Sequence, residues 1–221
     1  MPGTLILIAM LHANSARHTA LASLLPALAL LQRFDEATIE WHESVTDLAE
    51  LPLKLHRANF DLWHLEDSAR DLHATDAVIA GVKRGIDRTN QQRNDFVEQL
   101  DTSLLAALQP HDLPQYDAPM HSETPGMILD RLSILSLKRF HMNEQAQRKD
   151  ASVEHRKRSA DRLEILDVQS HDLVLCLEHL WSEVCLGTRR FAIYHQMKMY
   201  NDPTLNPVLY AAGTRTPAVG S

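Results

Sequence analysis

The sequence predicts an all-α protein, a helical bundle of about five main helices that includes long antiparallel helices. Three observations favour this class: long segments carry apolar residues at helical spacing, glycines are few, and aromatic residues are few. The 221 residues include 7 Gly, and 5% are aromatic, whereas an all-β fold needs many turns and many aromatic or β-branched positions. Amphipathic helices of this length can bury their apolar stripes only against one another, so a bundle follows.

The first half of the chain is expected to hold an N-terminal extension and three helices. Residues 1–35 are interpreted as a partly helical extension, and residues 36–210 as the bundle domain. A short amphipathic helix is predicted over 36–50. Pro52 then begins a helix with a stripe of Leu and Ala residues over 53–72. A long helix is predicted over 76–108, with Asp76 near its start and Pro110 past its end.

The second half is expected to hold three more helices, over 124–148, 151–186 and 189–200. The segment 109–121 contains three prolines and is predicted to be a loop. Thr124 can cap the helix that follows, with Pro125 at its first position. Gly187 is expected to end the helix over 151–186. Residues 211–221 have no apolar pattern and are interpreted as a mobile tail.

Composition excludes several classes of protein. The formal net charge of -7 argues against a general nucleic-acid binder. No apolar run reaches the roughly 18 residues of a membrane span, and Met1–Thr4 lacks the positive charge that begins a signal peptide. Cys176 and Cys185 lie on one predicted helix about 13 Å apart, too far for a disulfide. We therefore expect a cytoplasmic protein with two buried, reduced thiols.

The helix over 76–108 has a polar interruption in its apolar stripe. Apolar residues mark the stripe at both ends, but "DRTNQQRND" (87–95) separates them. Helical spacing carries the inward face through Asn90 and Arg93. An uncompensated buried charge costs several kcal/mol, so partners must lie near. A functional polar pocket is favoured; the alternatives are a kink, an exposed bulge or one satisfied buried pair.

Polar residues border the stripe of the preceding helix in "NFDLWHLEDSARD" (59–71). They recur at spacings of three and four: Asn59, Trp63, Glu66 and Arg70. His64 and Asp67 are three residues apart, so both could reach one metal ion. The alternative is an exposed or capped pair of side chains.

The segment "SETPGMILDRLSILSLKRFHM" (122–142) is apolar on nearly every side of its predicted helix, which indicates a central helix. Asp130 falls in an apolar sector, so we expect Asp130 or Arg131 to contact the helices at 59–71 or 76–108. Gly126 leaves backbone N–H groups free at the helix start, and Arg131 and Lys138 add positive charge. This combination suits a phosphate or carboxylate; the alternative is a plain cap with ion pairs to neighbouring helices.

These stretches, together with "MKMYNDPTLNPVLY", resemble the bacterial family known as domain of unknown function 4254, from about Trp41 to Tyr210. The resemblance implies no particular reaction. It adds polar positions at Lys198, Tyr200, Asn201 and Asp202, and leaves the N-terminal extension outside the match. Similar proteins are often encoded beside glycosyltransferases in cell-surface polysaccharide loci, which is an association and not a mechanism.

Two functions are expected from this pattern. In the first, a helical enzyme acts on a phosphorylated or nucleotide-linked small molecule, such as a sugar, with Glu66, Asp67 or Asp130 as general base or metal ligand. A divalent metal is compatible with these acids, although the Glu-x-x-Glu repeat of helical nucleotide pyrophosphohydrolases is absent. The expected substrate-binding residues are Asn59, His64, Arg70, Asp87, Asn90, Arg93, Asn94, Glu123, Gly126, Arg131, Lys138, Lys198, Tyr200, Asn201 and Asp202.

In the second, the protein is a non-catalytic helical partner of a glycosyltransferase complex, or a homodimer, and its buried charges set helix register. A deep pocket lined by all four stretches would favour the enzyme. A shallow surface with internally paired charges would favour the partner.

Overall fold

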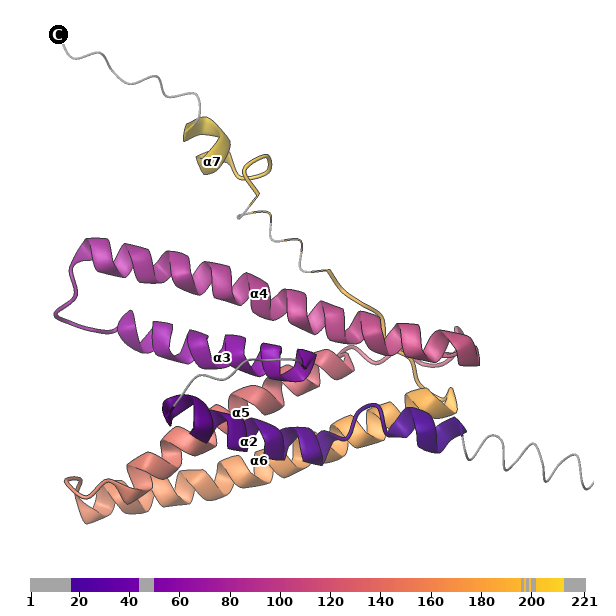
Figure 1. Ribbon diagram of the computed structural model, residues 1–221, viewed down its shortest axis with the longest axis horizontal. Coiled ribbons are helices and arrows are strands. Elements are labelled where there is room, and N and C mark those ends of the chain that lie inside the picture. The colour runs from indigo at the N-terminus through magenta and orange to yellow at the C-terminus, as the bar shows by residue number, and fades with distance from the viewer. Residues whose placement is uncertain (1–16, 44–49, 196, 198, 200–201, 213–221) are drawn as a thin grey trace, which may run out of the picture.

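The computed structural model describes residues 17–43, 50–195, 197, 199 and 202–212. These residues form two long antiparallel hairpins, and a further helix packs against both (Figure 1). The helices are α2 (Ala27–Glu43), α3 (Leu51–Ser68), α4 (Asp76–Leu108), η1 (Gln109–His111), α5 (Pro125–Gln147), α6 (Val153–Leu186) and α7 (Pro207–Ala212). No strand occurs in the described ranges, which contain one isolated bridge between Met120 and Arg190. The predicted all-α bundle is confirmed.

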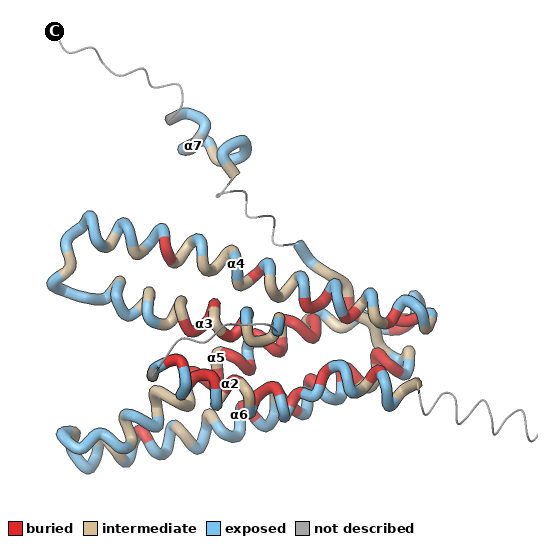
Figure 2. The backbone as a smooth tube through the Cα atoms, viewed as in Figure 1, coloured by how far each residue is buried: buried red, intermediate tan, exposed pale blue. Residues whose placement is uncertain are grey.

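Helix α5 is the centre of the bundle, as its apolar surface predicts. It packs against α2, α3, α4 and α6, and most of its first half is buried (Figure 2). The Thr124 side chain accepts a hydrogen bond from the Met127 backbone N–H at 3.2 Å, and Pro125 occupies the first turn. Its apolar side chains Ile128, Leu129 and Leu132 join the main core, together with Leu residues of α4 and α6 and the Trp181 ring.

Helix α4 spans the predicted residues 76–108, whereas α6 ends at the predicted residue 186 but begins at Val153, two residues after its predicted start. Thr75 caps α4 through a bond from the Val78 N–H, and Ser152 caps α6 through a bond from the His155 N–H. Gly187 follows α6 with φ +76°, in the left-handed region that favours glycine. Local capping chemistry is therefore sufficient to fix these ends.

Helix α2 begins nine residues earlier than the sequence predicts, at Ala27 instead of residue 36. Leu30, Leu31 and Phe34 of this segment are buried in the main core. Arg33, beside these apolar residues, forms an ion pair with Glu50. Residues 1–16 of the predicted extension, and 44–49 of the predicted helix over 36–50, lie outside the described residues.

Three local expectations are wrong. Helix α3 was expected to reach residue 72 but ends at Ser68. Leu72, expected in its apolar stripe, is 95% exposed. Residues 69–75 instead turn toward α4, and in this turn the Asp71 carboxylate accepts a hydrogen bond from the His73 N–H. Residues 189–195, expected to be helical, are not. The Arg190 backbone instead bonds Pro119 and His121 of the facing loop, which an extended segment can do and a helix cannot.

Cys176 is exposed and Cys185 is buried, so the expectation of two buried thiols holds for one of them. Both are free, as predicted, and burial raises the pKa of the Cys185 thiol to about 11. The short helix α7 lies apart from the bundle in Figure 1; it contains residues 211 and 212 of the predicted tail, and residues 213–221 lie outside the described part. In the chain as described, no helix combines the length and apolarity that crossing a membrane requires.

Candidate functional site

The Asp130 carboxylate lies where α3, α4 and α5 meet. The Asn59 side-chain amide of α3 donates to it at 2.8 Å, and the Arg93 Nε of α4 lies 3.6 Å from it. Burial raises the pKa of Asp130, while the Arg93 charge and the Asn59 hydrogen bond oppose this rise. Asp130 therefore contacts both helices, as its position in an apolar sector predicts.

A chain of buried hydrogen bonds continues from Asn59 into the core. The second hydrogen of the Asn59 amide goes to Ser133 Oγ at 3.0 Å, so the Ser133 hydroxyl is free to donate to His56 Nδ1 at 2.8 Å. His56 then carries its proton on Nε2 and donates to Thr38 Oγ1 at 2.9 Å. The Thr38 hydroxyl ends the chain at the Phe34 carbonyl, 2.8 Å away. Every donor in this chain has an acceptor, which assigns the His56 tautomer.

His56 is held neutral. It is fully buried, it stacks on Phe34 at 4.6 Å between ring centroids, and it lies 5.1 Å from the Trp41 ring. Burial lowers its pKa to about 3, against a smaller opposing effect of the Phe34 backbone. His56, Ser133 and Thr38 are not among the site residues predicted from the sequence. The spacing of His56 and Asn59, three residues apart on α3, was the available signal.

Arg93 is the polar residue of α4 that faces this centre, as the interrupted stripe predicts. Its Nε is buried and makes no hydrogen bond to a described acceptor, because the Asp130 oxygen is too distant at 3.6 Å. Asn94 is buried beside it, and Asn90 is half-buried. Asp87 instead pairs with Lys83 on the same helix, away from Asp130.

The start of α5 is occupied by a carboxylate of this chain. The Gly126 N–H donates to Asp101 Oδ1 at 2.7 Å, and a Cβ on Gly126 would meet both Asp101 oxygens and the Val97 carbonyl at 2.9 Å. Glycine is therefore required here by the close approach of α4. The N–H that was expected to receive a ligand anion is already bonded.

Asp101 is 2% exposed. Burial raises its pKa to about 6, against the bonds from Thr124 and Gly126, and Glu98 adds a smaller upward effect. Asp101 is not among the site residues predicted from the sequence. Its spacing from Val97, Leu104 and Leu108 places it on the inward face of α4 and was the available signal. Asp101 and Asp130 line a polar pocket of about 230 Å³.

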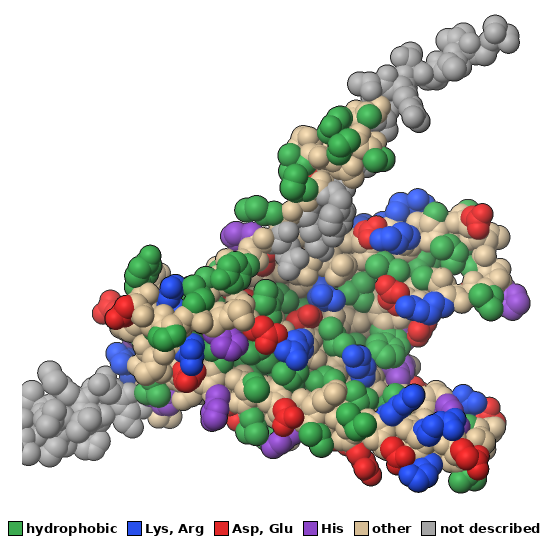
Figure 3. Space-filling view, turned by 180° about the vertical axis from the view of Figure 1, so that it is seen from behind, with side chains coloured by type: hydrophobic (Ala, Val, Ile, Leu, Met, Phe, Trp, Pro, Cys, Tyr) green, Lys and Arg blue, Asp and Glu red, His purple; other side chains and the backbone are tan. Residues whose placement is uncertain are grey.

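A groove runs over α5 between α3 and α6. Its largest part is a pocket of about 620 Å³. Two smaller pockets adjoin it. The first reaches Asn59 and Arg93 and shares Trp63 and Asp67 with the main pocket. The second reaches Arg131 and shares Lys138 and Gln169 with it. Seen from behind, the molecule is hollowed between the hairpins, with hydrophobic and basic side chains along the hollow (Figure 3).

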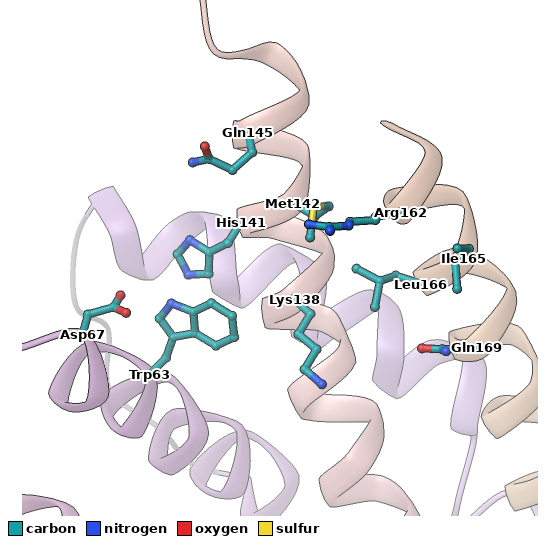
Figure 4. Close-up of a pocket in the computed structure, with 10 residues that line it drawn as sticks. All are labelled: Trp63, Asp67, Lys138, His141, Met142, Gln145, Arg162, Ile165, Leu166 and Gln169. Carbon is teal, nitrogen blue, oxygen red and sulfur yellow. The ribbon is translucent and has the colours of Figure 1, made fainter. Parts of the chain in front are cut away.

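The main pocket takes side chains from three helices (Figure 4). Trp63 of α3 and His141 of α5 stack with ring centroids 4.6 Å apart and planes 11° apart. Lys138, Arg162 and Asp67, which all line this pocket, form no ion pair within the described residues, whereas two ion pairs lie at its rim. Those rim pairs are Glu66 with Arg70 and Glu123 with Arg131.

The remaining predicted residues are placed as follows. His64 is exposed and its Nδ1 bonds the Phe60 carbonyl at 2.9 Å. The Thr204 hydroxyl and the Thr204 N–H donate to Asp202 at 2.6 Å and 2.7 Å, and these two bonds lower the Asp202 pKa. Asp202 lies near α7. Lys198, Tyr200 and Asn201 are outside the described residues. Within the described ranges, no group of three or more His, Cys, Asp and Glu side chains is suited to hold a metal ion.

Comparison with curated proteins and with solved structures gives no match. A family model described as "Protein of unknown function (DUF4254)" matches residues 49–193, which contain the Asp130 centre, the buried hydrogen-bond chain from Asn59 to His56, and the lining of the groove. The match covers more than half of the 221 residues, so this chain belongs to the DUF4254 family.

Proposed function

We propose that the groove over α5 binds a phosphorylated or nucleotide-linked small molecule, such as a nucleotide-linked sugar. One observation supports the proposal: Lys138 and Arg162 line the groove and form no ion pair within the described residues. Arg93 adds a third cation, whose ion pair with Asp130 is long at 3.6 Å and whose Nε makes no hydrogen bond. Cations that line a pocket beside apolar side chains favour an anionic ligand, because the anion supplies the missing partner.

Asp130 is the residue best suited to serve as a general base. It is buried, burial raises its pKa, and Arg93 beside it can hold an anion close to it. A carboxylate whose pKa is moved toward neutrality is a more effective base at physiological pH than a free one. Asp67 lines the same groove and Glu66 its rim, and they are the other acids within reach.

The test is a thermal-shift and calorimetric titration of the full chain with inorganic pyrophosphate, nucleoside diphosphates and sugar phosphates. A ligand at 100 times its dissociation constant stabilises the folded state by about 2.7 kcal/mol, which should raise the melting temperature by several degrees. Arg93→Ala should remove most of this shift. Lys149→Ala is the matched control, because Lys149 is exposed and lies outside the groove.

The proposal fails if none of these anions raises the melting temperature of the wild-type chain. It also fails if Arg93→Ala and Lys149→Ala bind alike. Urea unfolding of both variants separates a binding defect from a folding defect. If Arg93→Ala costs roughly 3–5 kcal/mol of stability and leaves binding intact, Arg93 instead neutralises a buried Asp130.

The alternative function, a non-catalytic helical partner of a glycosyltransferase or of a second copy, is favoured by the open form of the groove. The α5 face from Arg131 to Gln145 is about 21 Å long, and its rim charges at Glu66 and Glu123 are already paired. Light scattering tests self-association. Ile165→Glu should then abolish association and leave the fold intact, since Ile165 is 57% exposed.

A further inference from the structure

The main pocket has two unlike kinds of lining. Apolar and aromatic side chains form two of its sides, and the charged ends of Lys138 and Arg162 lie between them (Figure 4). Trp63 and His141 form one side, Ile165 and Leu166 of α6 form the other, and Met142 lies between them (Figure 4). The shape of this lining restricts the part of a ligand that fits there.

A planar ring with apolar faces and a polar edge matches this lining better than a hexose does. A hexose carries hydroxyls around its whole edge, and each one that is buried without a partner costs free energy. The Ile165, Leu166 and Met142 side chains can satisfy none of them. A nucleobase instead presents two faces that pack against apolar and aromatic side chains and confines its donors and acceptors to its edge.

The polar groups of the pocket fit the rest of a nucleotide. Asp67 on the Trp63 side and Gln169 on the α6 side lie at opposite sides of the pocket, so either can offer a polar group to a base edge, and Lys138 and Arg162 between them offer charge to phosphates (Figure 4). Trp63 and Asp67 also line the adjoining pocket, which contains Arg93. A volume of about 620 Å³ lies within the range of pockets that hold small molecules.

We propose that this pocket is a base subsite, in which a nucleobase packs between Trp63 and the Ile165–Leu166 side while its phosphates lie toward Lys138 and Arg93. The inference rests on the proposed function, because the phosphates supply the shared anchor. It goes further by stating that the ligand is a nucleotide and by fixing its orientation along the groove. The end of the ligand beyond the phosphates then lies toward Asp130.

Tryptophan fluorescence tests the subsite directly. Trp41 and Trp181 are buried in the core, so Trp63 is the tryptophan that a ligand in this pocket reaches. Nucleoside diphosphates (ADP, GDP, UDP and CDP) are titrated in parallel with inorganic pyrophosphate. At least one nucleoside diphosphate should bind about tenfold tighter than pyrophosphate and quench the fluorescence, whereas pyrophosphate should bind without quenching.

Three variants make the result specific. Trp63→Leu should remove the quenching and the tenfold advantage while pyrophosphate binding persists, and Trp63→Phe, which keeps an aromatic face, should retain most of the advantage. Ile165→Asn changes the opposite side at an exposed position and should reduce the same advantage without loss of the fold. Circular dichroism and urea unfolding verify that all three variants are folded.

The outcomes separate the two proposals. If pyrophosphate and all four nucleoside diphosphates bind with equal affinity and leave Trp63 unquenched, the base subsite is overturned and the anion site stands. A tenfold advantage that persists unchanged in both Trp63→Leu and Ile165→Asn also overturns it, because the base then binds elsewhere. If neither pyrophosphate nor any nucleotide binds, the proposed function itself fails.

Discussion

Helix α5 presents polar residues to two regions, which differ in whether those residues have partners within the protein. On the side of α2 and α3, Ser133 belongs to a buried chain in which each donor has an acceptor. On the groove side, Lys138 has no ion pair with a described residue, and neither does Arg162 across the groove. Polarity alone therefore does not mark a binding site. Satisfied groups hold the helices in register, and unsatisfied groups are the ones left for a ligand.

The largest expected effect is on stability, from the satisfied side. His56→Ala should lower the free energy of unfolding by about 3–5 kcal/mol, because it leaves a cavity between Phe34 and Trp41 and removes the partner of Ser133 and Thr38. Urea unfolding measures it. His171→Ala, at an exposed position of α6, should cost less than about 0.5 kcal/mol. A loss below about 1 kcal/mol for His56→Ala would show that the buried chain does not stabilise the bundle.

The next effect is a pH dependence that Asp101 adds to stability. Its folded pKa of about 6 lies above the usual value of 3.8, so the folded state holds the proton more tightly than the unfolded state. The stability that this proton contributes is fully present below about pH 3.8 and is lost as pH rises through about 6. This difference in pKa corresponds to about 3 kcal/mol of unfolding free energy.

Asp101→Asn keeps an oxygen acceptor for the Gly126 N–H and removes the titration. The wild-type chain should therefore lose stability relative to this variant between pH 4 and pH 6, as measured by urea unfolding at each pH. Parallel stability curves for the two proteins across that range would mean that the Asp101 pKa is not raised. Comparing variant with wild type cancels the contributions of Asp130 and other groups.

The smallest expected effect on stability lies on the unsatisfied side of α5. Lys138→Ala and Arg162→Ala should each change the free energy of unfolding by less than about 0.5 kcal/mol, yet weaken nucleotide binding several-fold. The salt dependence of binding should also become shallower in each variant, since one cation fewer meets the phosphates. Calorimetry at two salt concentrations measures both quantities. An unchanged affinity in both variants would place the two cations outside the site and reduce the contrast between the two sides of α5.

Much of the candidate centre followed from helical spacing alone. The stripe of α4 led to Arg93 and the apolar surface of α5 led to Asp130, and these two residues meet. Spacing allows the pair of Glu66 with Arg70, four residues apart, but it could not indicate that Glu123 pairs with Arg131, because Glu123 lies before the helix and eight residues away. It also could not indicate that Asp101 occupies the start of α5. That contact joins residues 25 positions apart and depends on how closely α4 approaches Gly126.

By itself, the sequence determined the helical class, the long hairpins and most helix ends, since these depend on residues within a few positions of one another: apolar stripes, Thr75, Thr124, Ser152 and Gly187. Tertiary structure alone decided the extended form of 189–195 and the start of α2. It also decided which polar groups are satisfied. The reason is physical: the hydrogen bond from Asn59 to Asp130 spans 71 positions, and that from His56 to Ser133 spans 77. No local pattern encodes such pairs, and only the packing of α2, α3 and α5 brings them together.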